Sequence, residues 1–101
     1  MCEYLPQGVV PADDAAAVRT DTPVLWLVGD GDPQDPPANL VKVPVQEPNS
    51  RILVMPAQQH VIGHLGCMPS VIAAFLDGGN VNQLDTACVA EGSPAPRFRL
   101  K

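Results

Sequence analysis

Two short runs of apolar residues set the pattern of this chain. Residues 24–28 read VLWLV and end at Gly29, and residues 52–55 read ILVM and end at Pro56. An uninterrupted apolar run between turn residues is typical of a strand that is buried on both faces of a parallel sheet. The pattern therefore predicts two strands at these positions.

A third apolar segment has the spacing of a helix. Within residues 67–79, CMPSVIAAFLDGG, Pro69 suits a first helical turn and Gly78 or Gly79 provides a stop. The apolar positions recur with the helical period and predict one face turned toward the core. This apolar stripe consists of Val71, Ile72, Phe75 and Leu76.

The segment between the two strands predicts an irregular crossover. About twenty residues separate the apolar runs, which is enough for a parallel connection. Residues 38–50, ANLVKVPVQEPNS, form a poor helix because Pro44 interrupts them and valine has a low helix propensity. In a parallel pair, the loops that follow both strands lie at the same end of the sheet.

The fold class that these elements predict is α/β. Strand, loop, crossover, strand, loop and helix make up only half of such a fold, because two parallel strands leave two bare edges. We therefore expect neighbouring structure outside this chain. The expected organisation is an extended lead-in over residues 1–20 and one α/β domain over residues 21–101.

Composition and charge narrow the classes of partner. A chain of 101 residues with 46% apolar residues is long enough for one domain at most, and a modest packed core is expected. Its formal net charge of -5 disfavours nucleic acid and anionic membrane surfaces, because both require a basic face. The apolar runs are too short to span a membrane. Residues 1–11 lack the basic and apolar regions of a signal peptide.

Three aspartates follow the first strand, in the stretch VGDGDPQDPP. A calcium loop that starts at Asp30 requires glycine at position 35 and glutamate at position 41, where this chain has Asp35 and Val41. Aspartate and glycine before proline also favour a simple turn. We assign Asp30 and Asp35 to turn chemistry and keep Asp32 as a candidate functional residue.

The loop after the second strand carries His60, His64 and Cys67 with the spacing H-x3-H-x2-C. Histidines four residues apart share a face only on a helix, and Gly63 between them indicates a loop. No fourth ligand is evident nearby in the sequence. The pattern gives little support to a zinc site.

Asp32 and His60 together point to hydrolase chemistry. Active sites of α/β proteins collect at the carboxyl ends of the strands, where both residues are expected. The triad of α/β hydrolases runs in the chain order Ser, Asp, His, and this chain offers the last two in that order.

Further motifs surround these two residues. They are G-x-x-D-P-x-x-P-P from Gly29, P-N-S-R from Pro48 before the strand that leads to His60, G-C-M-P from Gly66 with F-L-D from Phe75, and L-D-x-x-C ending at Cys88. In combination, over roughly residues 20 to 100, they resemble the C-terminal portion of tripeptidyl-aminopeptidase-like (TAP-like) α/β hydrolases. These hydrolases are relatives of proline iminopeptidase.

The resemblance implies a role for each residue. Asp32 would be the triad acid, and His60 would be the general base that takes the proton from a serine hydroxyl. Cys67 and Cys88 match a disulfide of such proteins, which would contribute about 3 kcal/mol by closing a loop. Cys2 matches a cysteine whose partner lies upstream of this chain, which would account for the odd count of three cysteines.

The chain departs from the family pattern at the nucleophile. Its serines, Ser50, Ser70 and Ser93, do not lie in a G-x-S-x-G motif. Without a nucleophile, the acid and the base have no proton to transfer. Val61 also replaces the glycine that usually follows the histidine in this family.

We therefore expect a C-terminal fragment of an aminopeptidase-like serine hydrolase that supplies acid and base but is inactive alone. Its partners would be the N-terminal hydrolase portion that carries the nucleophile and, in the full-length parent, a small peptide substrate. No cofactor or metal is expected. The alternatives are a stand-alone non-catalytic module for binding or assembly and a small metal-binding protein. A disulfide suggests a secreted or periplasmic protein, but no signal peptide is seen, so the localisation stays open.

Overall fold

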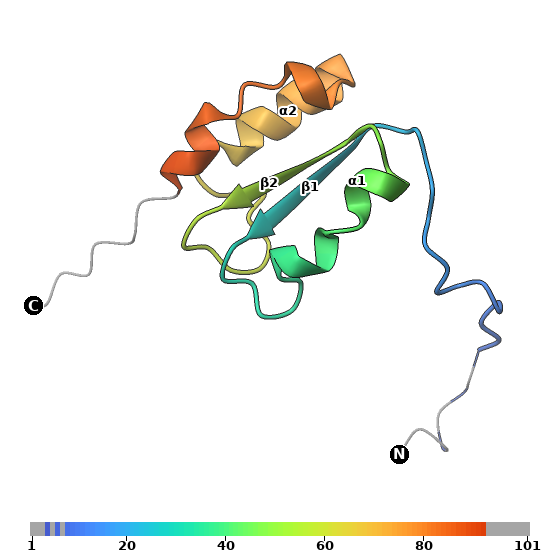
Figure 1. Cartoon of the computed structure of the whole chain (residues 1–101). Coiled ribbons are helices and arrows are strands. Elements are labelled where there is room, and N and C mark those ends of the chain that lie inside the picture. Colours follow the sequence, from blue (N-terminus) through green and yellow to red (C-terminus); the bar gives the residue numbers. More distant parts are fainter. Residues whose placement is uncertain (1–3, 5, 7, 93–101) are drawn as a thin grey trace, which may run out of the picture.

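The computed structural model describes residues 4, 6 and 8–92 (Figure 1). Its sheet consists of two parallel strands, β1 (Val24–Gly29) and β2 (Ser50–Met55). The register pairs Val24 with Ser50 and Gly29 with Met55, so the carboxyl ends of both strands lie at the same end of the sheet. The predicted parallel pair and the α/β class are confirmed. Cys2 and Ser93 lie outside the described residues.

Helical segments cover the two faces of this sheet (Figure 1). One face carries α2 (Met68–Gly78), followed by the 3₁₀ helices η3 (Val81–Gln83) and η4 (Ala87–Glu91). The other face carries the crossover, which contains the 3₁₀ helix η2 (Pro37–Leu40) and the single turn α1 (Val43–Gln46). Pro44 lies in the first turn of α1, where its missing N–H costs no hydrogen bond.

The hydrophobic core lies between the sheet and α2. Alternate strand residues point toward this face, with Leu53 and Met55 buried and Leu25 and Leu27 partly buried. The other buried members of the core cluster come from the segments after β2. They are Ile62, Met68, Val71, Leu84 and Val89.

Helix α2 confirms the predicted ends but not the whole apolar stripe. Pro69 lies in its first turn, and Gly79 ends it in a left-handed conformation with φ of 61°. Leu76 is 74% exposed, so its assignment to the core was wrong. The physical reason is that a sheet of two strands is narrow and covers only one row of helix positions. The stripe residues that do contact the core are Val71, Ile72 and Phe75.

Burial of the strands is also less complete than the sequence predicts. Val28 and Gly29 are buried at the end of β1, but residues 24–27 are only partly buried. Val54 on β2 is 41% exposed. Within the described part of the chain, β1 and β2 pair only with each other, so each strand keeps one unpaired edge.

The predicted disulfide between Cys67 and Cys88 is present. It joins the residue before α2 to η4 across a sequence separation of 21 residues. Closing a loop of this length contributes about 3 kcal/mol through the entropy of the unfolded chain. The disulfide therefore compensates in part for the small core.

Arg51 fastens the segment after α2 to β2. Its Nη1 donates hydrogen bonds to the backbone oxygens of Val81 and Leu84, at 3.0 and 3.1 Å. Its Nη2 donates to Oγ1 of Thr86 at 2.6 Å. One guanidinium thus binds two backbone oxygens and one hydroxyl of the segment after α2.

We predict that Arg51→Met lowers the free energy of unfolding by about 2 kcal/mol, because partly buried carbonyls lose a charged donor. Urea denaturation measures this change. Arg19→Met is the matched control, since Arg19 is exposed and surface substitutions change stability by less than about 0.5 kcal/mol. Equal stability of the two variants would contradict the role assigned to Arg51.

Candidate active site

The loops after β1 and β2 are in direct contact at the carboxyl end of the sheet. The backbone N–H of Gly31 donates to the backbone oxygen of Gln58 at 2.9 Å. A Cβ at Gly29 would overlap the backbone oxygens of Gln58 and Gln59. Glycine at position 29 therefore allows the second loop to cross directly over the end of β1. The sequence signal for this contact is the pair of glycines, Gly29 and Gly31, on either side of Asp30.

This contact brings Asp32 and His60 together, 28 residues apart in the sequence. Nδ1 of His60 lies 2.8 Å from Oδ2 of Asp32. The Asp32 side chain is only 5% exposed, whereas the His60 side chain is 46% exposed. The pair therefore has a buried carboxylate behind an imidazole that reaches the surface.

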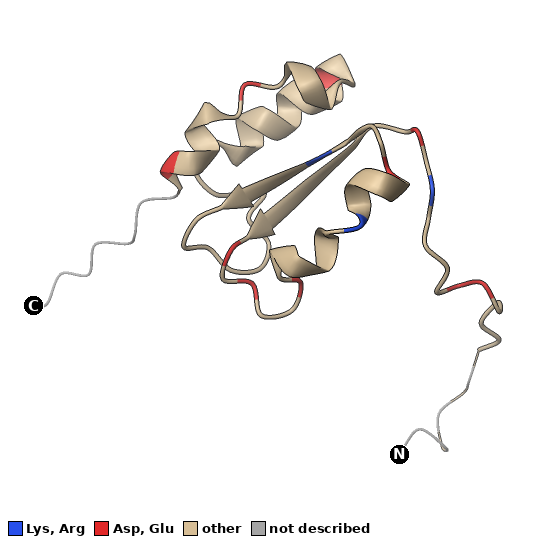
Figure 2. Cartoon of the chain, in the orientation of Figure 1, with Lys and Arg blue, Asp and Glu red and all other residues tan. Residues whose placement is uncertain are grey.

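The second carboxylate oxygen of Asp32 forms the turn. Its Oδ1 accepts hydrogen bonds from the backbone N–H groups of Gln34 and Asp35, at 2.8 and 3.1 Å. Asp32 thus fixes the loop and contacts His60 at the same time. The loop is a concentration of acidic residues (Figure 2).

Asp30 lies in a turn and Asp35 in a bend, as the sequence predicts, but their side chains do not form the turn. Both residues are exposed, and within the described residues neither carboxylate takes part in a hydrogen bond. Asp35 contributes only its backbone N–H, which is donated to Asp32. The sequence motif had already singled out Asp32, and the structure adds that its side chain makes the hydrogen bonds of this loop.

The pKa of Asp32 lies below its ordinary value of 3.8. Burial raises this pKa, but the hydrogen bonds from His60 and from the backbone N–H groups of Asp35 and Gln34 outweigh it. Asp32 is therefore a carboxylate at neutral pH. Its Oδ2 accepts a hydrogen bond from the N–H at Nδ1 of His60. In the neutral imidazole, this arrangement leaves Nε2 as the proton acceptor.

A pocket borders the pair along the unpaired edge of β1. Three consecutive strand residues, Trp26 to Val28, line it. Because strand side chains alternate between faces, consecutive residues border one pocket only where it runs along the edge of the strand. The Trp26 indole is held by a hydrogen bond of 2.8 Å from its Nε1 to Oε2 of Glu47. The remaining lining residues are Asp32, Asp35, Asn39, Leu40, His60 and Val61.

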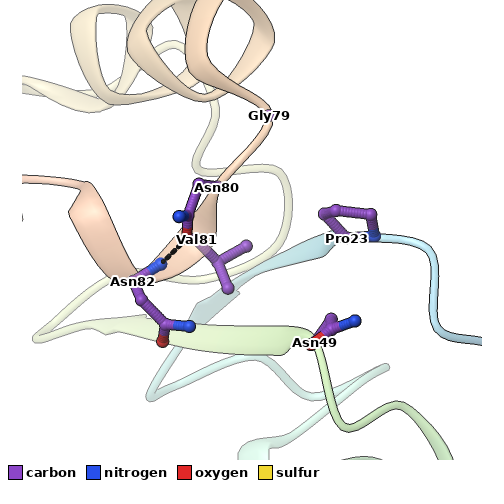
Figure 3. Close-up of a pocket in the computed structure, with 6 residues that line it drawn as sticks. All are labelled: Pro23, Asn49, Gly79, Asn80, Val81 and Asn82. Atoms are coloured by element: carbon purple, nitrogen blue, oxygen red, sulfur yellow. Dashed lines mark hydrogen bonds between the residues drawn. The ribbon is translucent and has the colours of Figure 1, made fainter.

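A second pocket lies at the opposite end of the strands (Figure 3). Pro23 and Asn49 directly precede β1 and β2, and the other lining residues follow α2. Oδ1 of Asn80 accepts a hydrogen bond of 2.9 Å from the backbone N–H of Asn82. None of its lining side chains is titratable, so this pocket offers neither an acid nor a base.

The spacing of His60, His64 and Cys67 does not correspond to a zinc site. Cys67 is bonded to Cys88, so its sulfur is not a thiolate ligand. Among the described residues, no three histidine, cysteine, aspartate or glutamate side chains are grouped as metal ligands. His64 is exposed.

A model of a known protein family matches residues 1–88, and its description is TAP-like protein. The chain belongs to the TAP-like protein family. The match includes both strands, Asp32, His60 and both cysteines of the disulfide. The two strands and their helices are therefore the TAP-like C-terminal region of an α/β hydrolase.

No curated protein and no solved structure matches the chain. Within residues 4, 6 and 8–92, no helix has both the length and the apolar character needed to cross a membrane.

We predict that Gly29→Ala destabilises the TAP-like region by about 2 kcal/mol or more, because the added methyl group meets backbone atoms that cannot rotate away. Chemical denaturation measures the loss. Gly78→Ala is the matched control, since Gly78 lies in α2 and has free space around it. That variant should gain about 0.5–1 kcal/mol. A neutral Gly29→Ala would disprove the close contact.

We predict that Asp32→Asn makes the free energy of unfolding less dependent on pH in the acidic range. A lowered pKa in the folded state means that ionised Asp32 stabilises the fold above its ordinary pKa of 3.8. This contribution is lost as the pH falls through the lower pKa of the folded state. Denaturation midpoints between pH 7 and pH 2, on a pH scale common to both proteins, test this. Asp30→Asn should retain the wild-type profile, and identical profiles for wild type and Asp32→Asn would contradict the prediction.

Proposed function

We propose that Asp32 and His60 are the acid and the general base of a serine hydrolase of the aminopeptidase type. The observation that carries the proposal is the hydrogen bond of 2.8 Å between Oδ2 of Asp32 and Nδ1 of His60. It lies at the carboxyl end of the strands, where α/β enzymes collect their catalytic residues. Membership of the TAP-like family supports the same chemistry.

The geometry of the pair fits the steps of acyl transfer. Asp32 holds the His60 tautomer in which Nε2 is unprotonated, and it stabilises the imidazolium that forms. Nε2 takes the proton of a serine hydroxyl as that oxygen attacks the substrate carbonyl, and then returns the proton to the leaving amine. The exposure of the His60 side chain, 46%, leaves this nitrogen accessible to a nucleophile.

The nucleophile comes from polypeptide outside these 101 residues. Ser50 opens β2, at the end of the strand remote from His60. Ser70 lies on α2 and borders a groove with the disulfide, not with His60. The pocket along the unpaired edge of β1 supports the same idea, because an adjoining strand there would extend the sheet beside the pair. On this proposal, short peptides with a free N-terminus, or related amides and esters, are the substrates of the complete hydrolase.

Hydrolysis of chromogenic aminoacyl and short-peptide anilides tests the proposal. The 101-residue chain should give no turnover. The same chain expressed with the upstream reading frame, where that frame encodes G-x-S-x-G, should hydrolyse these substrates. In this longer polypeptide, Asp32→Asn should lower the rate by about 10⁴-fold, and His60→Ala by at least about 10²-fold.

His64→Ala is the matched control, because His64 is exposed and makes no contact with Asp32. It should retain full activity. If the 101-residue chain hydrolyses these substrates and His60→Ala abolishes that activity, the proposal that the nucleophile lies outside the chain is wrong. A longer polypeptide that contains the serine motif but shows no hydrolysis would instead favour a non-catalytic module for binding or assembly.

A further inference from the structure

The loop that carries His60 contains the two non-glycine residues that have positive φ in the described part of the chain. They are Ala57, with φ of 55°, and Val61, with φ of 61°. A β-branched residue is the least suited to this left-handed region, because its branched side chain crowds the backbone. Val61 is therefore the more strained of the two.

Packing does not explain why Val61 accepts this conformation. Val61 is 65% exposed, so burial contributes little at this position. The residues on either side are fixed instead. Ile62 is only 1% exposed and belongs to the core cluster, while His60 is hydrogen-bonded to Asp32. Val61 is the one residue between a core anchor and the carboxylate pair.

We propose that Val61 is a positioning residue whose strain is coupled to the Asp32–His60 hydrogen bond. With the bond formed, the chain can connect His60 to Ile62 only through a left-handed residue 61. With the bond broken, residue 61 returns to a negative φ and the imidazole moves away from Asp32. The loop thus has two arrangements, and valine at position 61 brings their free energies closer together. This inference concerns the loop itself and holds whether or not the pair is catalytic.

A double-mutant cycle with Val61→Gly and His60→Ala tests the coupling. Glycine removes the strain but adds freedom to the unfolded chain. In the wild-type background, Val61→Gly should lower the equilibrium constant for unfolding. In the His60→Ala background, the strain is already released, so the same substitution should raise that constant. The two effects should differ by about tenfold. Effects that are equal in the two backgrounds would overturn the proposal.

Ala57→Gly is the matched control within the same loop. Ala57 precedes Gln58, which is held by the N–H of Gly31 and not by His60. Its substitution should therefore have the same effect in both backgrounds.

Nuclear magnetic resonance provides a second, direct readout. Residue 61 should show the strong intraresidue contact between amide and α protons that is typical of positive φ, and this contact should weaken in the His60→Ala variant. A residue 61 that keeps its positive φ without His60 would overturn the coupling.

Discussion

The close contact between the Gln58–Gln59 backbone and the glycines at and just after the end of β1 joins the two loops at the carboxyl end of the sheet. Gly29 has no room for a side chain, and the N–H of Gly31 donates to the oxygen of Gln58. This contact fixes how closely the second loop approaches the end of β1. The Asp32–His60 pair depends on this contact, because the two residues lie on different loops and form their hydrogen bond where these loops meet.

Asp32 combines two tasks that sequence reasoning treats as alternatives. One carboxylate oxygen closes the turn by accepting backbone N–H groups, and the other accepts the imidazole of His60. The turn bonds hold the carboxylate in one orientation and favour its ionised form. The structural role therefore supports the proposed chemical one, since a fixed and charged acceptor would orient His60 as a general base.

The remaining features reflect how little sheet the chain contains. Two strands cover only one row of α2, which leaves Leu76 in solvent, and the edge of β1 has no partner among the described residues. Links between distant segments compensate for this small core. The Cys67–Cys88 disulfide and the Arg51 hydrogen bonds both attach the segment after β2 to the sheet. At Val61, the geometry of the loop prevails over the local preference of the residue, which is for negative φ.

The sequence by itself determined the elements and their order. Uninterrupted apolar runs predicted both strands, and Pro69 with Gly78 or Gly79 marked the ends of α2. The combination of motifs predicted the family, and the resemblance to that family implied the disulfide. These properties are local or depend on fixed spacing, so the residues themselves carry them. Only the tertiary structure decided how the two oxygens of Asp32 are used, which helix positions are covered and which residues have positive φ. Each of these depends on the distance between segments that are far apart in the chain, and no periodicity along one segment encodes that distance.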